Sequence, residues 1–150
     1  MDQVVAASYH EAGHVIALRQ VRCRVLSVCV NGDGSGETMP NELPDKDEDK
    51  VLVALSGIQA ESHCTHTDTE IDDISQTYAS ASGDRCLIEK ESGRAWLSHT
   101  SLWHQTQYNR AQRFVEEHKE QIQTLAEAIL QKPAFPKCLS TTEIDAVVKR

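Results

Sequence analysis

The sequence predicts a mostly helical α+β protein with a small β-hairpin or sheet beside its first helix. Two long runs without proline, residues 3–18 and about 101–131, have helical patterns, and a valine-rich stretch at 21–30 leads into a glycine-rich turn. A length of 150 residues, with 39% hydrophobic and 25% charged residues, suits one globular domain with one core. We therefore expect a single domain over residues 1–150.

The first helix, expected over residues 3–18, is apolar on nearly every side, and Asp2 is a suitable N-cap. It carries His10, Glu11 and His14. Residues four apart share a helix face, so the two imidazoles can bind one zinc ion at about 2.0–2.1 Å. Glu11 then stands where a general base for a zinc-bound water belongs. The alternative is a hydrogen-bonded pair of core histidines, but burying these three groups without a metal would be costly.

A β-hairpin is expected to follow the first helix. Residues 21–30 are predicted to be a strand, 31–36 a turn, and 37–39 a short return strand before Pro40. The edge of such a sheet can bind an extended peptide through backbone hydrogen bonds, largely independently of its sequence. A plain hairpin that caps the core is the alternative.

Helices are expected to make up the rest of the chain. One is predicted over residues 47–62, where the acidic start suits the positive end of a helix. A second carries Asp72 and Asp73, and a long third helix spans about 101–131. A capping-box pattern, Ser140 with Glu143, indicates a short last helix.

Several segments resemble the zinc peptidase domain of the FtsH-type AAA proteases. Residues 9–17 read Tyr-His-Glu-Ala-Gly-His-Val-Ile-Ala, and residues 56–61 are similar to that family's Gly-Gly-Arg-x-Ala-Glu segment. Asp73-Ile74 resembles its Asn-Asp-Ile site, and residues 124–130 resemble its closing helix. The segments occur in the family's order and cover most of the chain. The resemblance implies a helical zinc peptidase domain with its small sheet beside the active-site helix.

The third zinc ligand has three candidates. A catalytic zinc site takes three protein ligands and keeps one position open for water. By resemblance the third ligand is Asp73, with Asp72 and Glu61 as the alternatives. Glu61 can instead orient a histidine from behind, or simply lie on the surface.

The composition limits the partners. A net charge of −8 argues against nucleic acid or an anionic membrane. No stretch approaches the ~20 apolar residues of a membrane span, and no signal peptide is visible. No phosphate loop of the form G-x-x-x-x-G-K-[ST] occurs, so cleavage should not need ATP. A peptide or unfolded protein is the expected substrate, and a separate ATPase or a homo-oligomer remains open.

The five cysteines form no C-x-x-C pair, and their odd number favours reduced thiols and a cytoplasmic location. Cys23 and Cys29 are expected to be small core residues of the strand. The sequence His-Cys-Thr-His at 63–66 invites a second metal site, but an ordinary exposed turn is the favoured interpretation.

Taken together, the sequence predicts a zinc-dependent, ATP-independent endopeptidase with Glu11 as its base. The competing interpretation is a zinc-stabilised module that binds peptides or a partner protease without cutting. Intact Glu11 favours the enzyme, because a binding module needs no base at that position.

Overall fold

The computed structural model describes residues 3–148 except 66–101, so the predicted helix around Asp72 and Asp73 lies outside the described residues. The described part is mostly helical with a small antiparallel sheet, which confirms the predicted α+β class. Its elements are α1 (Gln3–Gln20), β1 (Val25–Val30), β2 (Gly36–Pro40), α2 (Asp47–Thr65), α5 (Leu102–Glu117), α6 (Lys119–Leu130), β3 (Lys137–Ser140) and α7 (Thr141–Val147). No helix among these residues is long and apolar enough to cross a membrane.

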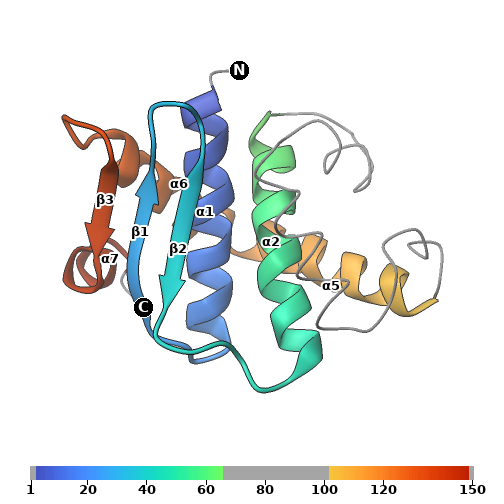
Figure 1. The fold of residues 1–150 in the computed structure, drawn as a ribbon. Coiled ribbons are helices and arrows are strands. Elements are labelled where there is room, and N and C mark those ends of the chain that lie inside the picture. Colours follow the sequence, from blue (N-terminus) through green and yellow to red (C-terminus); the bar gives the residue numbers. More distant parts are fainter. Residues whose placement is uncertain (1–2, 66–101, 149–150) are drawn as a thin grey trace.

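The central element is α1, which packs against α2, α6, β1 and β2 (Figure 1). Its residues between Ala6 and Leu18 are buried almost without interruption. A helix covered on every side needs no polar face, which is why its sequence is apolar all round. The predicted buried helix is thus confirmed, two residues longer than expected at its C-terminal end.

The predicted strand over 21–30 begins only at Val25, because the preceding residues end α1. Arg22 has a φ of 65°, in the left-handed region. The N–H of Cys23 donates to the Leu18 carbonyl at 2.9 Å, and that of Arg22 donates to the Arg19 carbonyl at 3.1 Å. This pair of bonds is a Schellman cap. It includes Arg22 and Cys23, which the valine-rich pattern had assigned to the strand.

The sheet has the order β2-β1-β3 and is antiparallel throughout. In its register Val28 of β1 lies opposite Thr38 of β2 and Leu139 of β3. Val28 and Val30 are fully buried, so this face of the sheet covers α1. The predicted hairpin is confirmed, and among the described strands β2 is at the edge of the sheet, beside the first helix.

The long helix predicted over 101–131 is two helices, α5 and α6, which meet at His118. The backbone of His118 leaves the helical region, with φ −113° and ψ 16°. Its backbone N–H and its ring Nδ1 both bond to the Phe114 carbonyl, at 3.0 and 2.8 Å, and its ring stacks on that of Phe114. The break lets α5 pack against α2 while α6 packs against α1, and neither contact is visible in the periodic pattern.

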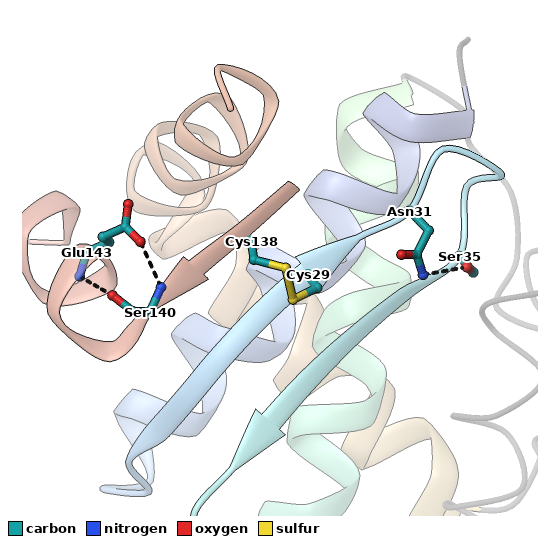
Figure 2. Close-up of a disulfide and its surroundings, with 6 residues drawn as sticks. All are labelled: Cys29, Asn31, Ser35, Cys138, Ser140 and Glu143. Carbon is teal, nitrogen blue, oxygen red and sulfur yellow. Dashed lines mark hydrogen bonds between the residues drawn. A yellow bond between two sulfur atoms is a disulfide. The ribbon is translucent and has the colours of Figure 1, made fainter. Parts of the chain in front are cut away.

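The C-terminal segment was only partly predicted. The capping box of α7 is confirmed, because the Ser140 hydroxyl accepts from the Glu143 N–H and the Glu143 carboxylate accepts from the Ser140 N–H (Figure 2). The strand β3 was not predicted. It has four residues, of which only Leu139 is fully buried, so it shows no alternation to detect.

A disulfide joins Cys29 of β1 to Cys138 of β3, across 109 residues of sequence (Figure 2). The expectation of reduced thiols is therefore wrong for this pair, as is the core position expected for Cys29. The two residues lie directly opposite in the register, on the sheet face turned away from α1. An odd cysteine count could not reveal this pairing, because it depends on β3. The cysteine argument for a cytoplasmic location is lost with it.

The remaining described free thiol, Cys23, is poorly suited to exchange with the disulfide. Burial raises the pKa of Cys23, and the negative charges of Glu42, Asp45 and Asp49 raise it further. A thiol that stays protonated is a weak nucleophile, so Cys23 should leave the Cys29–Cys138 bond undisturbed.

Replacing both Cys29 and Cys138 by serine should lower the free energy of unfolding by about 2–4 kcal/mol, because the crosslink restricts the unfolded chain. Urea unfolding without reductant measures the loss. Cys23→Ser is the matched control and should leave the crosslink intact. The pairing would be contradicted by a double variant that is as stable as the oxidised wild type. It would also be contradicted by a thiol titration that finds Cys29 and Cys138 free in wild-type protein kept without reductant.

Candidate metal centre

The three residues of the His-Glu-x-x-His motif come together in the structure, as predicted. His10, Glu11 and His14 are 1%, 4% and 7% exposed, and one ligand atom from each lies within 4.8 Å of the others. The two imidazoles meet edge to face, with ring centroids 4.7 Å apart. This buried group can hold a metal ion.

The ring of His14 is oriented by the backbone of α2. Its Nδ1 lies 2.8 Å from the Val53 carbonyl oxygen, a buried contact. A carbonyl oxygen only accepts hydrogen bonds, so the proton of a neutral imidazole must sit on Nδ1. That tautomer leaves the lone pair of His14 on Nε2, where a metal can take it.

The ring of His10 has a carboxylate behind it. Its Nδ1 lies 3.3 Å from Oε1 of Glu61, an ion-pair contact without the geometry of a hydrogen bond, and both side chains are 1% exposed. The carboxylate favours the proton on Nδ1 and again leaves Nε2 for a metal. Glu61 is thus buried rather than on the surface, and its place on the Nδ1 side puts it outside the ligand group. Of the other candidates for the third ligand, Asp72 and Asp73 lie outside the described residues.

Two glycines allow α2 to approach these histidines. A Cβ added to Gly57 would lie 2.3 Å from Cε1 of His14, so any side chain there would displace the ring. A Cβ added to Gly13 would lie 2.5 Å from the Ser56 carbonyl oxygen, which is backbone and cannot move aside alone. Both positions therefore require glycine for the α1–α2 contact that brings Val53 to His14.

The carboxylate of Glu11 is held by the edge strand β2. The Thr38 hydroxyl donates to Oε1 of Glu11 at 2.7 Å. Opposite the same side chain stands Gly36, where a Cβ would lie 2.7 Å from Cγ of Glu11. The strand thus leaves room for Glu11 and fixes one carboxylate oxygen. Neither Thr38 nor Gly36 was predicted to act here, because their contact with α1 depends on how the sheet packs.

The charge balance of the site suits a cation. Glu11 and Glu61 are both buried, and among the described residues no lysine or arginine forms an ion pair with either. Oε2 of Glu61 has no hydrogen-bond partner there. Buried carboxylates without a compensating charge are costly, and a divalent ion between the two imidazoles would supply that charge. Two nitrogen donors with a neighbouring carboxylate suit a divalent transition metal, zinc among them.

The His-Cys-Thr-His sequence at 63–66, expected to be an exposed turn, instead begins within the last turn of α2. Its residue 66 lies outside the described residues.

No family model matches the chain, and no curated protein is significantly similar to it. The resemblance to FtsH-type peptidases therefore depends on the quoted segments alone.

Glu61→Gln should weaken zinc binding by about 10–100-fold, because an amide orients the His10 proton less strongly than a carboxylate does. Competition with a chromogenic chelator measures the affinity. The matched control is Glu48→Gln, the same change at an exposed position of α2. Equal zinc affinity in the two variants would show that Glu61 does not support the metal site.

Proposed function

We propose that this chain is a zinc-dependent, ATP-independent endopeptidase of the FtsH-like type that cleaves peptides or unfolded segments. The observation that carries the proposal is the shared orientation of the two imidazoles. Nδ1 of His14 bonds to the Val53 carbonyl, and Nδ1 of His10 lies 3.3 Å from the Glu61 carboxylate, so Nε2 of each ring would be left for one ion, with Glu11 in the same group. Histidines that only stabilised a core would not need this arrangement.

Three residues would hold the ion. His10 and His14 would each contribute a ring nitrogen, and we propose Asp73 as the third ligand because it resembles the Asn-Asp-Ile site. When bound, zinc supplies a Lewis acid and lowers the pKa of water to about 7.

Glu11 acts as the general base in this scheme. Its carboxylate accepts a proton from the water that attacks the peptide carbonyl and then gives that proton to the leaving amine. Thr38 keeps Oε1 of Glu11 in place through its 2.7 Å hydrogen bond. Glu61 and the Val53 carbonyl keep the two imidazoles from rotating, which preserves the geometry during turnover.

The substrate binds as an added strand. β2 is the edge strand of the sheet that the described residues form, and its inner face holds Glu11 through Thr38 and Gly36. An extended segment paired with this edge would present its backbone to the proposed base and metal. A packed domain resists the opening that this needs, so peptides and unfolded segments are the favoured substrates.

A binding module that does not cut is the second candidate. It would share the metal, the histidines and the sheet edge. The hydrogen bond from Thr38 to Glu11 favours the enzyme, because it fixes a carboxylate that a binding module has no need to position.

The substitution Glu11→Gln separates the two candidates. It keeps the size of the side chain and removes the base, so zinc content should stay at one ion per chain while hydrolysis of unfolded casein falls at least about 100-fold. In contrast, His10→Ala and His14→Ala should each lose the zinc. A zinc-loaded wild type that cleaves nothing would support the binding module instead.

The third ligand is tested by a matched pair, Asp73→Asn and Asp72→Asn. Direct coordination is lost outright only in the first, so Asp73→Asn should weaken zinc binding by about tenfold or more while Asp72→Asn leaves it nearly unchanged. Metal analysis after dialysis against a weak chelator reports both. The reverse order would assign the ligand to Asp72.

A further inference from the structure

The outer face of β2 carries two exposed side chains that the proposed chemistry does not use. Strand residues alternate between faces, and β2 turns Gly36 and Thr38 toward Glu11. Glu37 and Met39 therefore point to the opposite face, away from α1. Both are exposed, Met39 to 43%.

Neither side chain belongs to the hydrophobic core that the described residues form. Glu37 lies opposite Cys29 in the register, and within the part of the chain that the structure describes its carboxylate forms no ion pair. Met39 lies opposite Ser27, next to the irregularity in β1 that leaves Leu26 43% exposed. An acid and an adjacent apolar surface are thus presented side by side on an edge strand.

An added strand would place its own side chains against this pair. Directly opposite residues of paired strands have Cβ atoms about 4.5–5.5 Å apart, close enough to interact. The substrate residues opposite Glu37 and Met39 would share the outer face and be two positions apart. The residue between them would point inward, to the side of Glu11 and the metal ligands.

We propose that Glu37 and Met39 are specificity-determining residues that select segments with a lysine or arginine two positions from an apolar residue. The inference rests on the proposed function, because it needs the substrate to pair with β2. Charge supports it: a carboxylate without an ion-pair partner attracts a cation opposite it and repels an acid. The chain's net charge of −8 acts in the same direction.

The test uses a series of unstructured peptides, alike except for one position occupied by Lys, Gln or Glu, with valine two residues away. Successive peptides in the series carry the varied residue and its valine one position further along. At one position the wild type should cleave the Lys peptide about two- to fivefold faster than the Glu peptide in kcat/KM, the range expected for an exposed charge pair. The preference should fade at high salt, where such pairs are screened.

The variants Glu37→Gln and Glu37→Lys decide whether Glu37 is the cause. The first should abolish the preference and the second should invert it, with zinc content unchanged in both. Glu116→Gln is the control, because it removes the same charge from an exposed position on α5 and should keep the wild-type order. A preference that survives in Glu37→Lys would overturn the assignment.

Binding keeps this test separate from the proposed catalysis. The same peptides, labelled with fluorescein, are titrated by anisotropy against the zinc-loaded Glu11→Gln protein and against Glu11→Gln/Glu37→Lys. Tighter binding of the Lys peptide by the first protein and of the Glu peptide by the second supports the inference even if the wild type cuts nothing. Equal affinities in both proteins overturn it even if the wild type is an active peptidase.

Discussion

The close approach of α1 and α2 is the contact on which the rest of the structure depends. It requires glycine at positions 13 and 57, because a Cβ at either would meet backbone or the His14 ring at 2.5 Å or less. Because the helices touch there, the Val53 carbonyl reaches one histidine and Glu61 reaches the other. Helix packing thus sets the tautomer of His14 and places a carboxylate beside Nδ1 of His10, and both contacts influence the direction in which a metal would be bound.

The burial of α1 gives this site its rigidity. The sheet covers one side of the helix, and α2 and α6 pack on the others, so the motif cannot move without disturbing the core. The edge strand adds the last restraint, since its inner face holds Glu11 while its outer face remains exposed. One short strand therefore holds Glu11 on one side and presents exposed side chains on the other.

The sequence predicted what depends on local pattern. The apolar run of α1, the hairpin, the acidic start of α2 and the capping box of α7 are each written within a few residues, and all were confirmed. The grouping of His10, Glu11 and His14 followed from helical spacing alone. Three features were missed or wrongly predicted: the strand β3, the division of one long helix into two at His118, and the disulfide. The strand β3 and the disulfide depend on contacts between segments far apart in the chain, and the split at His118 depends on bonds to Phe114 that the apolar period does not record.

The contacts that surround the His-Glu-x-x-His motif could not be predicted from the local sequence either. Thr38 is one of several threonines in the chain, and only the packing of β2 on α1 makes its hydroxyl a partner of Glu11. Glu61 was recognised as a candidate, but its burial behind His10 could not be read from its place in a helix, where an exposed position was equally acceptable.

The charge balance links the site to the fold. Two buried carboxylates and two imidazoles lie close together, and among the described residues no lysine or arginine is paired with either acid. In the absence of a cation that arrangement opposes the packing of α1 against α2. An ion bound to the native state only would stabilise that state in proportion to its affinity and concentration. The histidines and acids that could hold a metal would then also make that metal a part of the core.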